Sequence, residues 1–132
     1  MSDYTEFAGI EADIYAQRIV DALKNLVVTA LQNGFSKTSY LVQDHIKYIK
    51  RIQSAKSPMG YIKYVAKKLF PEGDPKGEAR MTKLKEKYKG KDTLIQKFEA
   101  VYKLYQNIPE FGPPKRAISA DEAEEVLAEL LA

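Results

Sequence analysis

The chain has 132 residues, 45% of them hydrophobic and 30% charged, a composition that predicts one folded domain and excludes a disordered chain. It contains no cysteine, which excludes disulfides and thiolate metal sites. The N-terminal segment is acidic without an apolar run, and no segment has about 18 consecutive apolar residues. We therefore expect no signal peptide and no membrane-spanning helix, and predict a cytoplasmic location.

The net charge of +3 is distributed unevenly along the chain. Residues 1–36 hold two basic and five acidic residues, a balance of −3, and residues 98–132 hold three and seven, a balance of −4. Residues 37–97 hold sixteen basic and six acidic residues, a balance of +10. A solvated lysine surface usually pairs its cations with nearby acids, which here lie elsewhere in the chain. The basic middle therefore predicts a polyanionic partner, with nucleic acid favoured.

Apolar residues recur at helical spacing nearly throughout, and no segment alternates like a strand, so the predicted class is all-α. The first helix is expected over about residues 9–32, ended by Asn33 and Gly34. Its expected apolar side is Ile10, Ile14, Leu23, Leu26, Val27, Ala30 and Leu31.

The second helix is expected over about residues 38–55, with Ser36, Thr38 or Ser39 as its cap. At 100° per residue, one side carries Leu41, His45, Tyr48, Ile49 and Ile52. The opposite side carries Gln43, Lys47, Lys50, Arg51 and Ser54. Three cations therefore share one face of this helix.

Ser57 followed by Pro58 predicts the start of a third helix that reaches about residue 70. Its predicted buried residues are Ile62, Val65 and Leu69, with Lys63 and Lys67 on another face. A loop rich in proline and glycine follows at residues 71–78. The fourth helix, over about residues 78–89, carries an apolar stripe of Met81, Leu84 and Tyr88 and a separate basic stripe of Arg80, Lys83 and Lys87.

Asp92 is expected to cap a fifth helix, which ends before Pro109. Its apolar positions are Leu94, Ile95, Phe98, Val101, Tyr102, Tyr105 and Ile108. Ser119 and Glu122 form a capping box that opens a sixth, acidic helix. We expect a compact bundle of five helices over residues 1–108, which binds RNA, and a proline-rich turn and short amphipathic helix over residues 109–132.

The terminal helix carries an apolar stripe of Val126, Leu127, Leu130 and Leu131. A helix of about twelve residues is marginal alone. We expect protein to cover the stripe, either the chain's own bundle or a neighbouring copy, with docking between copies favoured by the acidic charge of the helix.

The catalytic signals are weak. His45 is the single histidine and lies on an apolar helix side, where a histidine is usually packed and hydrogen-bonded. Metal-ligand spacing and the phosphate-binding G-x-x-x-x-G-K-[ST] loop are both missing from the sequence. The acids of residues 121–125 lie in the first turn of a helix, where the dipole favours negative charge. We therefore expect that the chain is not an enzyme and that it binds no cofactor and no metal ion.

The remaining signal is basic residues interleaved with aromatics, in the stretch from Tyr40 to Lys68. Lysine outnumbers arginine there, and lysine suits phosphate more than base edges. This composition predicts backbone binding that tolerates any base sequence, with most of the tyrosines interpreted as core. The predicted RNA-binding residues are Lys47, Lys50, Arg51, Lys63, Lys67, Lys68, Arg80, Lys83 and Lys87.

Three segments, in order, resemble the small subunit of type III-A (Csm) CRISPR effector complexes. KTSYLVQDHIKYIKRI at residues 37–52 is similar to that family's Thr-Ser helix, which ends in lysine, arginine and isoleucine. IKYVAKK at residues 62–68 is similar to its L-x-Y-x-A-x-R segment, and FEAVYKLY at residues 98–105 to its closing F-x-E-A-x-x-A-Y helix. The likeness covers roughly residues 10–108, and the tail from residue 109 lies outside it.

The resemblance implies a five-helix bundle, repeated in several copies, that contacts the backbones of guide RNA and target RNA without cutting them. It also implies antiviral defence, other effector subunits as partners, and RNA contacts at Lys50, Arg51, Lys67 and Lys68. Two alternatives stay open: a coat protein of a filamentous archaeal virus, which wraps DNA, and a free-standing DNA-binding regulator with a helix-turn-helix.

Overall fold

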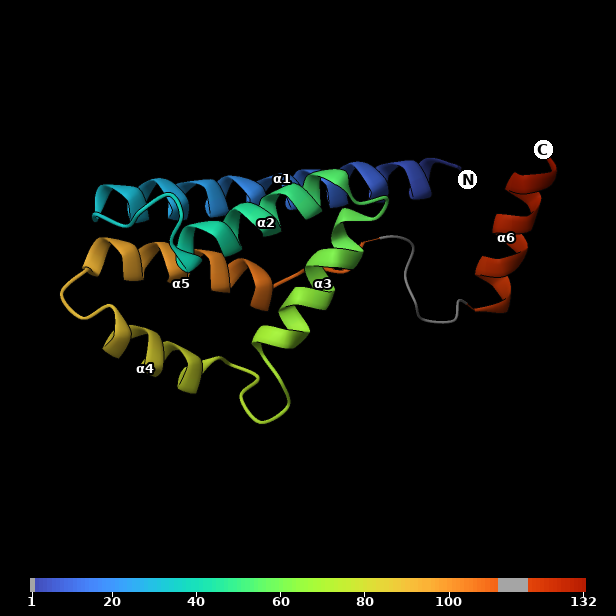
Figure 1. The fold of residues 1–132 in the computed structure, drawn as a ribbon. Coiled ribbons are helices and arrows are strands. Elements are labelled where there is room, and N and C mark those ends of the chain that lie inside the picture. The colour runs from blue at the N-terminus through green and yellow to red at the C-terminus, as the bar shows by residue number, and fades with distance from the viewer. Residues whose placement is uncertain (1, 112–118) are drawn as a thin grey trace. The chain divides into compact units, whose positions relative to one another are not determined.

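A computed structural model describes residues 2–111 and 119–132 of the chain (Figure 1). These residues form six helices and no strand, which confirms the all-α class. The helices are α1 (Ser2–Gln32), α2 (Tyr40–Ser54), α3 (Pro58–Leu69), α4 (Glu78–Lys87), α5 (Asp92–Gln106) and α6 (Ala120–Leu131). None of these helices is both long enough and apolar enough to cross a lipid bilayer.

The described chain divides into two compact units. One unit covers residues 13–109 and contains most of α1 and all of α2 to α5. The other combines residues 1–12 with residues 110–132 and contains α6. Both cavities described below lie within the larger unit.

Serine side chains begin three of the helices. Ser39, Ser57 and Ser119 each accept a hydrogen bond from a backbone N–H in the first turn. The sequence predicts Ser57 and Ser119, and of its three candidates for α2 the cap is Ser39. The predicted cap of α5 is wrong, because Asp92 is its first helical residue and Lys91 precedes it without a side-chain cap. Asp92 instead places its negative charge in the first turn, where the helix dipole favours it.

The start of α1 also differs from the prediction. The helix begins at Ser2 and runs through Gly9, where the sequence places its start. A glycine inside a helix costs about 1 kcal/mol relative to alanine, which is too little to interrupt a long helix.

Helix α5 is the centre of the larger unit. Its buried residues are Leu94, Phe98, Val101, Tyr102 and Tyr105. α3 and α4 both pack against it, and α2 packs against α3. The Tyr15 hydroxyl donates to the Leu104 carbonyl at 2.5 Å, and Asn33 Nδ2 donates to Thr93 Oγ1 at 3.4 Å. These two bonds show that α1 runs antiparallel to α5 (Figure 1).

The buried side of α1 differs from the one predicted. It consists of Tyr15, Ala16, Ile19, Val20, Leu23, Leu26, Val27, Thr29 and Ala30. Ile10 and Ile14 are 58% exposed and Leu31 is 44% exposed, so these three predicted positions are wrong. At 100° per residue, Ile10 lies opposite Ile19, so the predicted set combined two sides of one helix.

Helix α6 contains no buried residue. Leu127 and Leu130 are each 54% exposed, and Leu131 is 78% exposed. The expectation that protein covers this stripe stays a prediction. The proline-rich residues 112–118 lie outside the described part of the chain.

The Tyr105 side chain is 4% exposed, and its hydroxyl has no hydrogen-bond partner among the described residues. A buried hydroxyl without a partner carries a desolvation penalty of about 1–3 kcal/mol. Burial also raises the pKa of this phenol well above its ordinary range. The hydroxyl therefore opposes folding and contributes no bond to the core.

We predict that Tyr105→Phe keeps or raises the free energy of unfolding, by up to about 2 kcal/mol. Tyr15→Phe is the matched control, because it removes a hydroxyl that donates to the Leu104 carbonyl, and it should lower the same quantity by about 1 kcal/mol. Urea unfolding of both variants measures the two changes. A destabilisation by Tyr105→Phe as large as that by Tyr15→Phe would contradict this account of the core.

Candidate nucleic-acid interface

Side chains of α2, α3 and the start of α4 enclose a cavity of about 330 Å³, called here the basic groove. Its lining is Lys47, Tyr48, Arg51, Tyr61, Tyr64, Val65, Lys68, Leu69 and Arg80. Four of these residues are cations and three are tyrosines, and none of the described lining residues is Asp or Glu. The groove therefore concentrates positive charge that no carboxylate in its walls offsets.

The helix repeat explains this concentration. Lys47 and Arg51 lie four residues apart on α2, and Tyr64 and Lys68 lie four residues apart on α3, so each pair shares one helix face. Packing of α2 on α3 brings the two pairs into one cavity. Lys68 Nζ lies 5.3 Å from the centre of the Tyr64 ring, a cation–π distance.

Arg80 joins the groove to the rest of the site. Its Nε donates to the Leu69 carbonyl at 2.8 Å, which ties the beginning of α4 to the last residue of α3. Its backbone N–H donates to Asp74 Oδ2 at 3.0 Å, and the Ala79 N–H donates to Asp74 Oδ1 at 3.2 Å. The Asp74 carboxylate therefore caps α4, where Gly77 at the N-cap has no side chain to do so.

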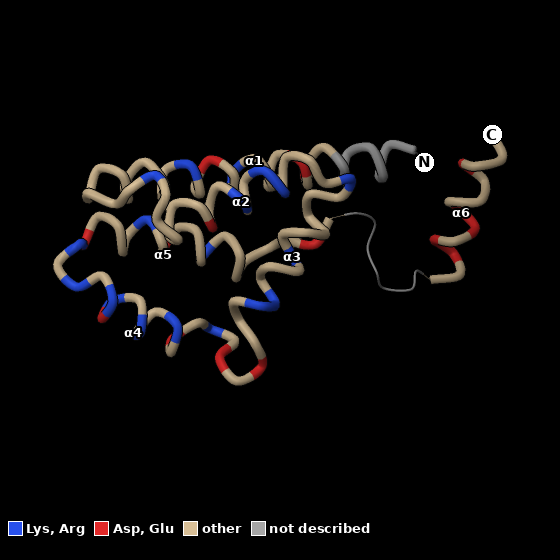
Figure 2. The backbone as a smooth tube through the Cα atoms, viewed as in Figure 1, with Lys and Arg blue, Asp and Glu red and all other residues tan. Residues whose placement is uncertain are grey.

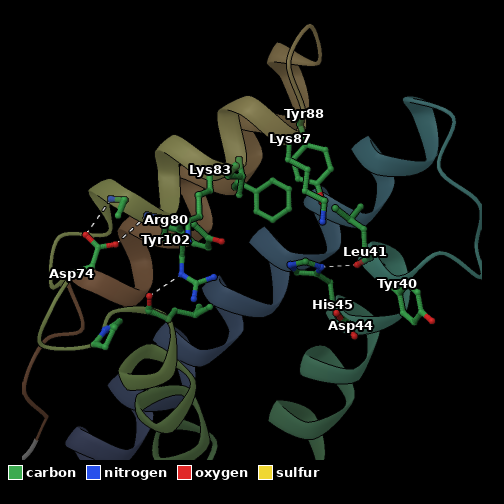
Figure 3. A pocket seen from close by; sticks show the side chains of 15 residues that line it. Tyr40, Leu41, Asp44, His45, Asp74, Arg80, Lys83, Lys87, Tyr88 and Tyr102 are labelled. Carbon is green, nitrogen blue, oxygen red and sulfur yellow. Dashed lines mark hydrogen bonds between the residues drawn. The ribbon is translucent and has the colours of Figure 1, made fainter.

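A second cavity of about 570 Å³, called here the α2–α4 pocket, shares Leu69 and Arg80 with the groove (Figure 3). One wall is α2, with Tyr40, Leu41, Asp44 and His45, and the other is α4, with Arg80, Lys83, Leu84 and Lys87. Phe98 and Tyr102 of α5 complete the lining together with Leu69, Pro71, Asp74, Ala79 and Tyr88. The shared residues make the two cavities neighbours.

The structure brings six of the nine predicted RNA-binding residues to these cavities. Lys47, Arg51 and Lys68 line the groove, Lys83 and Lys87 line the pocket, and Arg80 lines both. Lys50, Lys63 and Lys67 are exposed and line neither of the two cavities described here. The blue segments of Figure 2 accordingly recur along α2, α3 and α4.

Tyr40 and Tyr64 line the two cavities although most of the tyrosines were predicted to lie in the core. Tyr40 is 90% exposed at the pocket and Tyr64 is 57% exposed at the groove. Tyr64 lies beside Lys68 in space, whereas the buried Tyr102 and Tyr105 belong to the apolar side of α5. A position off the apolar side of its helix is the signal that separates Tyr40 from the core tyrosines.

His45 is packed and hydrogen-bonded, as the sequence predicts. Its ring meets the edge of Phe98 with centroids 5.5 Å apart, and Nδ1 lies 2.6 Å from the Leu41 carbonyl oxygen. A carbonyl only accepts, so Nδ1 carries the proton and donates it. Burial lowers the pKa of the imidazole, while the Leu41 hydrogen bond and the charge of Asp44 oppose that shift. The ring is therefore neutral at pH 7, with an acceptor lone pair at Nε2.

Among the described residues, no three His, Cys, Asp or Glu side chains are grouped so that they could hold a metal ion. Comparison with known proteins found no matching family model, no matching curated protein and no matching solved structure.

We predict that the imidazole of His45 titrates below its ordinary pKa of 6.5. The folded state then takes up a proton less readily than the unfolded state, so the contribution of His45 to the free energy of unfolding is fully present above pH 6.5 and is lost as pH falls below it. As the only histidine in the chain, His45 gives a single imidazole signal for an NMR titration. In His45→Gln this part of the pH dependence should disappear. An NMR midpoint at or above 6.5 would be the contrary result.

Proposed function

We propose that this chain is a non-catalytic small subunit of a type III CRISPR ribonucleoprotein effector that binds the backbones of guide RNA and target RNA. The basic groove is the observation that carries the RNA-binding part of the proposal. The likeness of residues 37–52, 62–68 and 98–105 to the small-subunit family supports the effector part. Its partners are RNA, the other effector subunits and further copies of the same chain.

The charge in the groove favours a polyanion. Lys47, Arg51 and Lys68 come from two helices and converge without an acidic neighbour in the lining, which raises the local positive potential. Such a cluster destabilises the free protein through mutual repulsion unless an anion occupies it. Phosphates on a strand match it, because each bound phosphate releases condensed counterions.

The exposed tyrosines favour a single strand over a duplex. A half-exposed aromatic ring beside a cation, such as Tyr64 with Lys68, offers a stacking surface for an unpaired base. Bases in a duplex are already stacked and do not present their faces. This feature favours RNA strands over the duplex DNA that a viral coat protein wraps, and it suits backbone binding with little sequence preference.

Copies of the subunit are proposed to contact one another through the terminal helix. α6 carries Asp121, Glu122, Glu124, Glu125 and Glu129 but no Lys or Arg, whereas α2, α3 and α4 together carry ten Lys and Arg residues (Figure 2). Its exposed leucines need a protein surface to cover them. Opposite charge and exposed apolar area together support docking of α6 on a neighbouring copy.

The groove gives a salt-dependence test. Replacing Lys47, Arg51 and Lys68 together by Ala should weaken binding of single-stranded RNA and flatten its log–log salt dependence by about two units, since each lost phosphate contact removes about 0.7. The matched control replaces Lys50, Lys63 and Lys67 by Ala. These substitutions remove the same amount of positive charge from α2 and α3, at positions that do not line the groove. Filter binding at several salt concentrations measures both slopes.

The variant with Lys50, Lys63 and Lys67 replaced (the control triple) should change the slope less than the variant with Lys47, Arg51 and Lys68 replaced (the groove triple). Equal slopes for the two triples would show that general surface charge binds RNA and that the groove has no special part. A groove triple that binds like the unmodified chain would remove the groove from the interface.

Composition of the natural assembly tests the effector part of the proposal. Native mass spectrometry of material purified from the host should find a guide RNA, several unlike subunits and more than one copy of this chain. A filament containing duplex DNA would replace the proposal with a coat protein. A dimer without RNA or other subunits would replace it with a DNA-binding regulator.

A further inference from the structure

The α2–α4 pocket is larger than the groove, and phosphate binding alone does not account for it. Its volume of about 570 Å³ lies in the range of pockets that hold a small organic ligand. Nine of its fifteen lining residues are apolar or aromatic, including Leu41, Leu84 and Phe98, and the other six are three cations, two acids and His45. A ligand that fits must therefore combine a flat apolar part with a charged part.

Charge is divided between the two walls of the pocket. The α4 wall carries Arg80, Lys83 and Lys87, whereas the α2 wall carries Asp44 and the acceptor nitrogen of His45 (Figure 3). Asp74 also lines the pocket, but both of its oxygens accept backbone N–H groups at the start of α4. The pocket thus favours an anionic group against α4 and N–H donors against α2.

A stacking surface lies at the α2 wall. Tyr40 is the first residue of α2 and is 90% exposed, although a ring of this size usually buries much of its area. In Figure 3 the Tyr40 ring lies at the outer edge of the α2 wall, farther from α4 than His45. A planar heterocycle bound there would stack on Tyr40 while its N–H groups reach the acceptors of α2.

We infer that the α2–α4 pocket binds one nucleotide, with its base against Tyr40 and Asp44 of α2 and its phosphate against Lys83 and Lys87 of α4. A nucleotide has both required parts at its two ends: a flat nitrogen heterocycle with N–H donors and a phosphate. The ligand chemistry follows from the pocket itself. Identification of the nucleotide as one unit of a bound strand rests on the proposed RNA-binding function.

The neighbouring groove suggests how a strand would reach the pocket. Arg80 and Leu69 line both cavities, so a strand whose phosphates occupy the groove passes the mouth of the pocket. One unstacked base could then enter the pocket without leaving the backbone contacts. Since most bases of the strand would stay outside, the sequence preference of RNA binding should remain small.

His45 makes the inference measurable with three simple probes. AMP, adenosine and inorganic phosphate are titrated into the full chain while the single imidazole is followed by NMR. AMP should shift the His45 signal saturably, adenosine should do so with about tenfold lower affinity, and phosphate alone should leave the signal in place. If AMP gives no saturable shift, or if phosphate gives the same shift as AMP, the inference is overturned.

Variants assign the two ends of the ligand. Tyr40→Ala should weaken AMP binding by about tenfold through lost stacking, and Tyr64→Ala, which replaces an exposed tyrosine of the groove, is its control.

The double variant Lys83→Ala with Lys87→Ala should lower the affinity for AMP close to that for adenosine and leave the affinity for adenosine unchanged. Lys85→Ala with Lys89→Ala is the matched control, because both lysines are exposed beside the same helix and outside the pocket. Pocket variants that bind AMP as tightly as their controls would overturn the assignment.

The groove triple distinguishes nucleotide binding in the pocket from RNA binding in the groove, because it removes cations of the groove alone. It should bind AMP normally while losing affinity for an RNA strand, and an RNA oligomer should compete with AMP in the unmodified chain. AMP binding without competition by RNA would identify a free nucleotide as the ligand and reject its origin in a strand. RNA binding at the groove without AMP binding would overturn the pocket and leave the proposed function standing.

Discussion

Phe98 lies where α2, α4 and α5 meet, and its ring sets the spacing of the two walls of the site. The His45 ring of α2 meets it with centroids 5.5 Å apart at 77°, and the Tyr88 ring at the end of α4 stacks on it at 5.5 Å and 13°. Tyr102 packs edge-on at 6.0 Å. Aromatic rings bury large areas and prefer such geometries, so this cluster fixes α2 and α4 on opposite sides of one side chain.

The charged surfaces depend on this apolar centre. The cations of α2, α3 and α4 gain little from one another and stay solvated, so burial of α5 must hold them together against their repulsion. His45 belongs to the apolar centre and not to the charged surface. Its neutral ring, with a lowered pKa, packs in the core and adds no further positive charge behind the basic walls.

Local sequence signals predicted much of the fold. The serine caps at Ser39, Ser57 and Ser119 and the exposed cations of α2 depend on near neighbours in the chain, so the sequence contains them directly. The buried side of α1 was predicted incorrectly at Ile10 and Ile14. In a long helix with apolar residues on more than one side, packing partners select the buried side, and a single sequence does not name them.

The site was predictable in its residue types but not in its grouping. The sequence placed Arg80, Lys83 and Lys87 on one stripe, yet the Leu69 hydrogen bond gives Arg80 a second role in the groove formed with α2 and α3. Lys47 and Lys68 are 21 positions apart and meet only because α2 packs on α3. Lys50 and Lys67 are the chain neighbours of Arg51 and Lys68, but they do not line the groove, because adjacent helix residues point in directions about 100° apart.

Photo-cross-linking tests the central claim, that single-stranded RNA lies along the basic groove, most directly. RNA containing 4-thiouridine is irradiated with the full chain, and the cross-linked residues are identified by mass spectrometry. The account predicts cross-links at Tyr61 and Tyr64 of α3, the tyrosines that line the groove next to Lys68. Cross-links confined to α1 or α6, with none on α2, α3 or α4, would contradict it.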